Sequence, residues 1–128
     1  MSYAFYNWIH VFTLIGVFSS LGAITIYAAT GGQKADFKVR KMLGITHGVL
    51  MVIAFIAGFR LMARGGYSFG NDPWLFAKIL IWLIVGAYPA FVWRLKGKGI
   101  LLFWGLFIIA IIATYIALFK FGVPQFRN

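Results

Sequence analysis

Four long apolar runs constrain this chain more than any other feature of its sequence. They lie near residues 6–29, 42–63, 74–93 and 100–121, and each is close to the ~20 residues that carry a helix across ~30 Å of hydrocarbon. The runs lack the strict alternation of barrel strands and are far longer than such strands. The sequence therefore predicts an all-α integral membrane protein.

The segments between the runs are short, so successive helices should be antiparallel neighbours. This predicts one four-helix antiparallel transmembrane bundle, with residues 1–128 as a single domain. Composition agrees, because 62% of the 128 residues are hydrophobic and 11% are charged, too few charges to cover a soluble domain. The first run has no basic start and is longer than a signal h-region, so we expect a permanent helix rather than a cleaved signal.

Basic residues dominate the loops, where they indicate topology and contact with anionic lipid headgroups rather than nucleic-acid binding. Seven lie in the first and third loops and four on the opposite side of the membrane. The positive-inside rule then predicts a multi-pass protein of a bacterial-type inner (plasma) membrane, with both termini outside the cytoplasm. The first set is Lys34, Lys38, Arg40, Lys41, Arg94, Lys96 and Lys98, and the second is Arg60, Arg64, Lys120 and Arg127.

Local signals predict a helix start and three packing seams. Asp72 can cap the third helix, and Pro73 fits its first position. Pairs of small residues let helix backbones approach closely in a membrane, and three such pairs occur at helical spacing. They are Gly16 with Ser20, Gly44 with Gly48, and Ala54 with Gly58.

Three helices bring polar side chains to one depth near the outer end of the predicted bundle. His10 lies about one turn into the first helix, Lys78 about one turn into the third, and Tyr115 one to two turns from the end of the fourth. Ionisable groups inside a membrane are costly and usually functional. No acid interrupts an apolar run, so a charged Lys78 must reach the headgroups, lose its proton or balance a bound anion.

A carboxylate-bearing tetrapyrrole fits this set of residues. Its ring suits an apolar slot, its propionates suit Lys and Arg, and its iron suits a neutral imidazole. We therefore predict a haem or porphyrin site with His10 as the metal ligand and His10 and Lys78 as the reactive pair. Further cofactor-binding candidates at this level are Arg60, Arg64, Tyr115, Trp8 and Trp74.

Simpler interpretations stay open for both central residues. Lys78 can extend its ammonium group to the headgroups from one turn deep. His10 can donate a hydrogen bond to a neighbouring carbonyl or to Tyr115. Neither alternative requires a ligand.

The second histidine, His47, lies in the opposite leaflet from His10. The offset along the membrane normal should be roughly 15–20 Å, too far for the two imidazoles to share one iron. At its depth on the third helix stands Tyr88, next to Pro89. We therefore predict a His47–Tyr88 hydrogen bond inside the bundle.

The layout of the chain resembles the HemJ-type protoporphyrinogen oxidases, and more broadly the small haem-associated membrane families of the SirB and CopD types. That resemblance implies b-type haem held through His10, with Lys78 also essential. It further implies oxidation of a porphyrinogen substrate and transfer of electrons to a quinone or another respiratory-chain acceptor. The stretches that carry it are Asn7-Trp8-Ile9-His10-Val11, Arg40-Lys41-Met42-Leu43, Trp74-Leu75-Phe76-Ala77-Lys78 and Phe119-Lys120-Phe121.

Two other classes of function remain open. The scarcity of acids, and Tyr88-Pro89 where the family has a Tyr-His pair, favour a cofactor-free accessory subunit of a larger membrane complex or a homo-oligomer. A proton or ion pathway is the weakest interpretation, because without an intramembrane acid it would depend on His10, Lys78 and Tyr115 alone.

Overall fold

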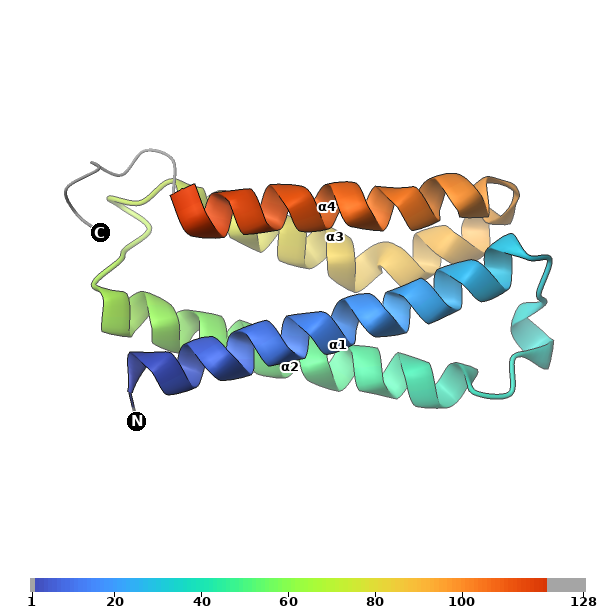
Figure 1. The fold of residues 1–128 in the computed structure, drawn as a ribbon, viewed down its shortest axis with the longest axis horizontal. Coiled ribbons are helices and arrows are strands. Elements are labelled where there is room, and N and C mark those ends of the chain that lie inside the picture. Colours follow the sequence, from blue (N-terminus) through green and yellow to red (C-terminus); the bar gives the residue numbers. More distant parts are fainter. Residues whose placement is uncertain (1, 120–128) are drawn as a thin grey trace.

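The computed structural model describes residues 2–119 and contains four long helices joined by short loops (Figure 1). They are α1 (Tyr3–Ala29), α2 (Arg40–Gly65), α3 (Trp74–Arg94) and α4 (Gly99–Phe119), with short 3-10 turns at Lys34–Asp36 and Lys96–Lys98. All four are long and apolar enough to cross a membrane. The predicted all-α transmembrane bundle is thus confirmed. Lys120, Arg127 and the end of the Phe119-Lys120-Phe121 stretch lie outside the described residues.

Local chemistry explains where the helices begin and end. The Ser2 hydroxyl accepts a hydrogen bond from the Phe5 N–H at 3.2 Å and so caps α1. Gly66 ends α2 with φ 73°, a left-handed conformation that glycine adopts without strain. Pro73 occupies the N-cap position of α3 and supplies no side-chain cap. The predicted cap, Asp72, lies one residue earlier, and its carboxylate accepts from the Ser68 N–H at 2.8 Å within the loop.

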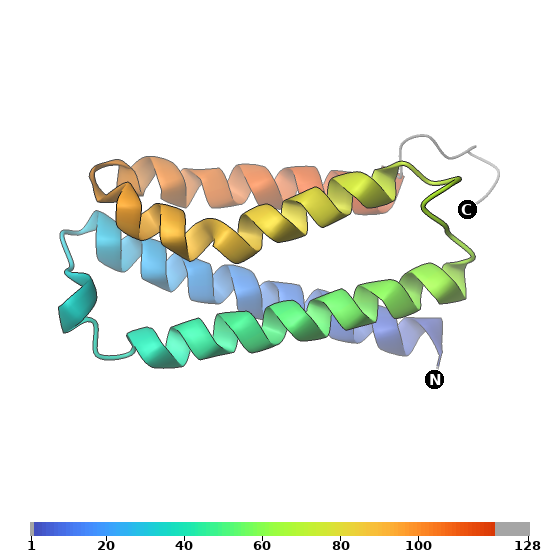
Figure 2. The ribbon, with the colours of Figure 1, turned by 180° about the vertical axis from the view of Figure 1, so that it is seen from behind.

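The helices are not parallel, because α1 crosses the bundle diagonally. Its N-terminal half lies nearer α2 and its C-terminal half nearer α3 and α4 (Figures 1 and 2). Two close approaches hold this crossing. A Cβ at Gly16 would overlap Leu50 of α2, and a Cβ at Gly99 would lie 2.6 Å from the Cα of Ala29.

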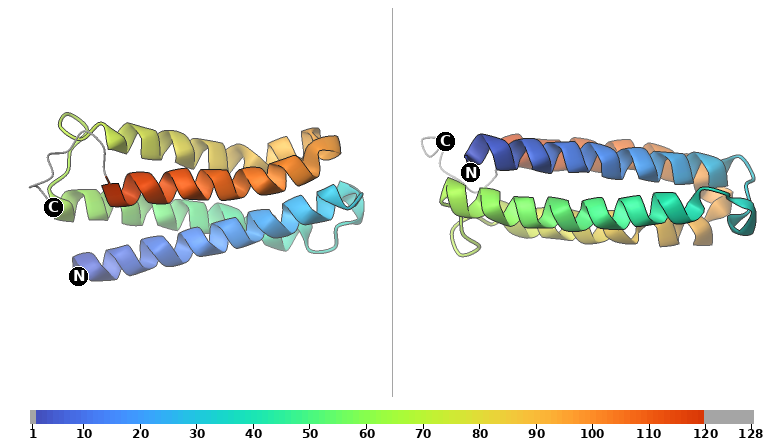
Figure 3. Two further views of the ribbon diagram at one scale, coloured as in Figure 1. Left: turned by 45° about the horizontal axis from the view of Figure 1, so that its top comes forward. Right: turned by 90° about the horizontal axis from the view of Figure 1, so that it is seen from below.

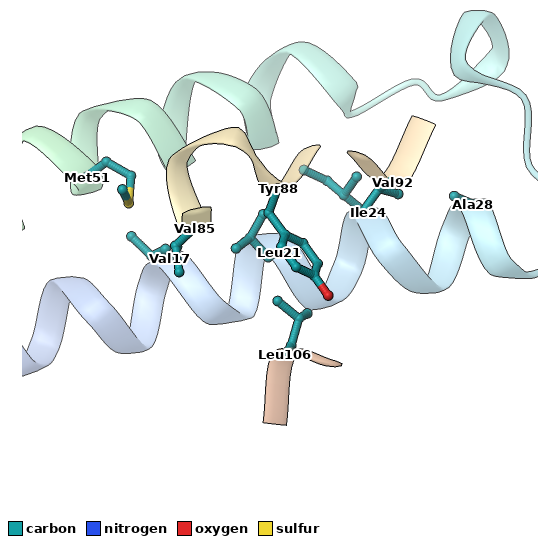
Figure 4. Packing of buried hydrophobic residues seen from close by; sticks show 9 residues of the cluster. All are labelled: Val17, Leu21, Ile24, Ala28, Met51, Val85, Tyr88, Val92 and Leu106. Atoms are coloured by element: carbon teal, nitrogen blue, oxygen red, sulfur yellow. The ribbon is translucent and has the colours of Figure 1, made fainter. Parts of the chain in front are cut away.

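The main hydrophobic core occupies the half of the bundle near the first and third loops (Figure 4). Its fully buried members Val17, Leu21 and Val92 come from α1 and α3. A smaller cluster of Trp74, Leu75 and Ile116 lies toward the opposite end. Space between these two packed regions is where the candidate site lies.

One predicted packing seam is wrong. Gly44 and Gly48 are exposed, and a Cβ at either position would meet nothing within 4 Å. The reason is the rotation of α2, which buries the stripe of His47, Met51 and Ala54 and turns the two glycines outward. Gly16 and Ala54, by contrast, do lie at the contact between α1 and α2, as predicted.

The contact at Gly99 gives a direct test of the diagonal crossing. Gly99→Leu should lower the free energy of unfolding by about 1–3 kcal/mol, because the new side chain meets the Ala29 backbone. Unfolding of the purified protein in mixed micelles measures it. Gly97→Leu is the matched control, since a Cβ there meets nothing within 4 Å. Equal stability of the two variants would contradict this packing.

Candidate functional site

Two cavities meet in the outer half of the bundle, and the second continues past its middle. The first, about 210 Å³, lies among all four helices. The second, about 550 Å³, lies mainly between α1 and α4. Of the residues that the structure describes, seven line both cavities. Only His10 and Lys78 among these seven have ionisable side chains. The two residues predicted at one depth therefore line the same interior space.

His10 is held against α2 by its ring nitrogen. Its Nδ1 lies 2.9 Å from the carbonyl oxygen of Ala54. Because a carbonyl only accepts, Nδ1 carries the proton, and the Nε2 atom of a neutral ring keeps its lone pair. Gly58 leaves room for the ring, since a Cβ there would make a tight contact of 3.3 Å with the His10 Cε1. A hydrogen bond to a neighbouring carbonyl was also expected if His10 binds no ligand, and the acceptor is the carbonyl of Ala54.

Lys78 projects from α3 into both cavities. It is half-buried and shares both cavity walls with the His10 ring. No Asp or Glu lies among the described wall residues of either cavity. The two cavities therefore share one lysine and one imidazole on otherwise largely apolar walls.

An aromatic cap, made of Tyr67, Phe69 and Trp74, covers the outer end of the first cavity. The rings of Tyr67 and Trp74 meet edge to face with centroids 5.2 Å apart. The loop that carries two of these rings is fixed by the Ser68–Asp72 hydrogen bond, and Asp72 is fully buried. These rings therefore form the wall of the cavity on the side of the second loop.

The other predicted cofactor-binding residues lie on different faces of their helices, so some line a cavity and others face outward. Trp74 lines the first cavity, as predicted. Trp8 is 63% exposed and stacks on Phe12, and Tyr115 is 58% exposed and contacts Phe119. Tyr115 therefore does not bond His10.

The two arginines also lie away from the cavities. Arg60 and Arg64 belong to the last turns of α2, and both are exposed. Neither side chain is among the described wall residues. Of the seven predicted site residues, the structure brings His10, Lys78 and Trp74 together at the cavity walls.

Sequence reasoning missed two polar residues that lie one helical turn from His10 and Lys78 on the cavity wall. Asn7 lies three residues before His10 on the same face of α1 and lines both cavities. Trp82 lies four residues after Lys78, and its Nε1–H donates to the Met51 carbonyl at 3.1 Å. Helical spacing from the two predicted residues is the signal that could have found both.

The predicted His47–Tyr88 hydrogen bond is wrong. His47 Nε2 lies 3.2 Å from the carbonyl of Val85, and the Tyr88 hydroxyl donates to the carbonyl of Leu102 on α4. The reason is Pro89, which has no N–H to offer the carbonyl four residues earlier. That carbonyl belongs to Val85, so the imidazole replaces the missing helix hydrogen bond.

Metal chemistry would rest on a single protein ligand. Among residues 2–119 there is no group of three or more His, Cys, Asp or Glu side chains that could hold an ion. His47 lines neither cavity. His10 is the one imidazole among the described residues that line the two cavities.

Comparison with known proteins identifies no relative of this chain. No protein-family model matches the chain, and no curated protein or solved structure is detectably similar to it. The functional argument therefore depends on the residues and their geometry.

The bond that replaces the missing helix link can be tested with a double-mutant cycle. His47→Leu should lower the free energy of unfolding by about 1–3 kcal/mol, because it leaves the buried Val85 carbonyl without a hydrogen-bond donor. In a Pro89→Ala background the new N–H bonds that carbonyl, and the same substitution should cost clearly less. Unfolding in mixed micelles of the four proteins measures both costs. An equal cost in the two backgrounds would contradict the role given to His47.

Proposed function

We propose that this chain binds b-type haem or a related porphyrin in its membrane interior, and that it is a redox enzyme resembling protoporphyrinogen oxidase. One observation carries the proposal. The Nδ1–H of His10 is donated to a backbone carbonyl at the wall of a pocket between the helices. Histidines that bind metals almost always donate their other ring N–H in this manner, which fixes the tautomer and the ring orientation.

The surrounding residues fit such a group in three respects. Aromatic side chains such as Phe55, Phe59 and Trp82 give the cavity flat apolar walls. Lys78 supplies a cation for a carboxylate. The first cavity alone is smaller than the about 300–1,000 Å³ of typical ligand pockets, whereas the second, at about 550 Å³, is within that range. A planar ring would therefore use the space that the two cavities share.

Each residue has a defined part in this proposal. His10 would provide the axial ligand through Nε2, with Ala54 fixing its tautomer and Gly58 leaving room for its ring. Lys78 would pair with a propionate or transfer a proton, and that pair is strong where water is excluded. Bound haem would supply one-electron chemistry through its iron.

The wider biochemical setting follows from the same proposal. A porphyrinogen would be the substrate, and its electrons would pass to a quinone or another respiratory-chain acceptor. Neither the substrate nor the acceptor needs an aqueous route, because the site lies within apolar helices.

A cofactor-free accessory subunit is the second candidate function, and one observation favours it. Gly44 and Gly48 expose a smooth strip of α2 on the outer surface, with open space beyond each Cα. Small residues at this spacing are common where transmembrane helices associate. In this alternative the strip would contact a larger membrane protein or a second copy of the chain.

Absorption spectra separate the two candidates. Protein purified in detergent from cells with ample haem should show a Soret band that sharpens on reduction with dithionite. His10→Ala should abolish the band, because it removes the axial ligand. His47→Ala is the matched control and should keep it, since that histidine bonds Val85 and lines neither cavity. A flat spectrum of folded wild-type protein, or a band that survives His10→Ala, would overturn the haem assignment.

We also propose that both termini lie outside the cytoplasm of a bacterial-type inner membrane. The support is the larger number of basic residues in the first and third loops. The chain contains no cysteine, so single cysteines can report on each loop without background.

In intact cells, a membrane-impermeant maleimide should label Asn71→Cys in the second loop and leave Gln33→Cys in the first loop unlabelled. Both positions are exposed, so access from the two sides of the membrane decides the result. Permeabilised cells provide the control, because both variants should then react. Labelling of Gln33→Cys alone in intact cells would show the opposite orientation.

A further inference from the structure

The first and third loops meet at one end of the bundle. Figure 3 shows both loops at that end in each of its two views. A Cβ at Gly99, where the third loop passes into α4, would lie 2.6 Å from the Cα of Ala29, the last residue of α1. The first loop starts directly after Ala29. The two loops are therefore held side by side.

Three aromatic rings fix the first loop against the ends of α1 and α3. Tyr27 of α1 and Phe37 of the loop are stacked, with ring centroids 4.1 Å apart. Trp93 of α3 meets both rings edge to face, with centroids 6.3 Å away in each case. The Tyr27 hydroxyl also donates to the Gln33 carbonyl of the loop at 3.1 Å. Since Trp and Tyr side chains gather at the level of lipid headgroups, this folded loop lies at the membrane surface.

Six exposed basic side chains lie on the surface that these two loops form. Asp36 is the only acid there, because the other acid of the chain, Asp72, belongs to the second loop. None of the six is among the described wall residues of the two cavities. We call this surface the basic face, and its members are Lys34, Lys38, Arg40, Lys41, Arg94 and Lys98.

We propose that the basic face binds an anionic phospholipid, with the phosphate held jointly by the first and third loops. Like charges gathered on one small surface repel one another, and an anion relieves that repulsion. Each Lys or Arg near a lipid surface favours anionic headgroups. The phosphate comes from a lipid rather than from solution, because the acyl chains hold it at the level of the loops at high effective concentration.

The structure adds a fixed arrangement to the general contact that the sequence predicts for every basic loop. Phe37 belongs to the same loop as Lys34 and Lys38. It contacts Trp93, the residue before Arg94. Basic side chains from the two loops are therefore brought together before any lipid binds, which lowers the cost of binding one headgroup.

Native mass spectrometry of the full chain, released from detergent micelles, tests the proposal. Dioleoyl phosphatidylglycerol should bind at least about 10-fold more tightly than dioleoyl phosphatidylcholine, which has the same chains and no net charge. Lys38→Gln combined with Arg94→Gln removes one charge from each loop and should leave a preference of less than about threefold. Equal binding of the two lipids by the wild-type protein would overturn the proposal.

Arg60→Gln combined with Arg64→Gln is the matched control. It removes the same charge from exposed arginines at the opposite end of α2, so the wild-type preference should remain. Circular dichroism and unfolding in the same detergent check that both double variants fold. An equal loss of preference in the two would show that net charge alone attracts the lipid, and would overturn the site.

The part played by the fixed loop has its own test, in which no charge changes. Phe37→Ala should lower the preference about threefold, because the loop must then be ordered when the lipid binds. Phe12→Ala should keep the wild-type preference, since it removes a ring of α1 that stacks on Trp8, away from both loops. An unchanged preference in Phe37→Ala would contradict joint binding by the two loops.

Inorganic phosphate separates a lipid from a soluble anion. At millimolar concentration it should leave phosphatidylglycerol in place, and displacement of the lipid would overturn the proposal in favour of a soluble anion. The outcome does not depend on haem, because the basic face and the two cavities share no described residue. Selective lipid binding by a protein whose spectrum is flat would therefore support this proposal and overturn only the proposed function.

Discussion

Polar groups inside a lipid bilayer must find partners within the protein, and the rest of this structure depends on how the chain meets that constraint. It sends side-chain donors to main-chain carbonyls of the neighbouring helix. These bonds tie α1 to α2, α2 to α3 and α3 to α4, so they form one connected set. The donor and acceptor pairs are His10 with Ala54, His47 with Val85, Trp82 with Met51, and Tyr88 with Leu102.

The two histidines make the same kind of bond with different consequences. His47 bonds the Val85 carbonyl, which has no helix donor because Pro89 lacks an N–H. This imidazole therefore supplies the missing hydrogen bond, and it is buried. The acceptor of His10, Ala54, has no proline four residues later, and its helix bond is not interrupted. That second bond therefore serves to orient the ring. His10 also lines both cavities beside Lys78, and this position makes it the functional candidate of the two.

Length and hydropathy are local properties, which is why the sequence was enough to predict four transmembrane helices. The depth of a residue in the membrane could also be estimated by counting residues from the helix end, and this correctly placed His10 and Lys78 at one level. The side of the helix on which a residue lies could not be predicted in the same way, because it depends on how each helix is rotated about its own axis. Trp8 and Tyr115 have suitable depth but lie on lipid-facing sides, whereas Trp82 faces the cavity.

The backbone carbonyls that accept these hydrogen bonds could not be predicted either. Every residue has a carbonyl, and the pattern of side chains does not show which one is used. Val85 is the exception, since a proline four residues later identifies its carbonyl in advance. Reasoning from side chains alone chose Tyr88 as the partner of His47 and missed this. In a membrane bundle, the backbone left open by a proline is therefore a better first guess for a buried donor than a nearby polar side chain.

The energetic cost of empty space gives a reason for the cavities to be occupied. At about 24 cal/mol per Å³, leaving a volume of about 210 Å³ empty would cost at most about 5 kcal/mol, an upper bound because this cavity is partly open. Lipid chains can fill the second cavity, between α1 and α4, from the side. The first cavity lies beneath the aromatic cap, where a ligand that brings its own apolar surface to His10 and Lys78 would recover that energy.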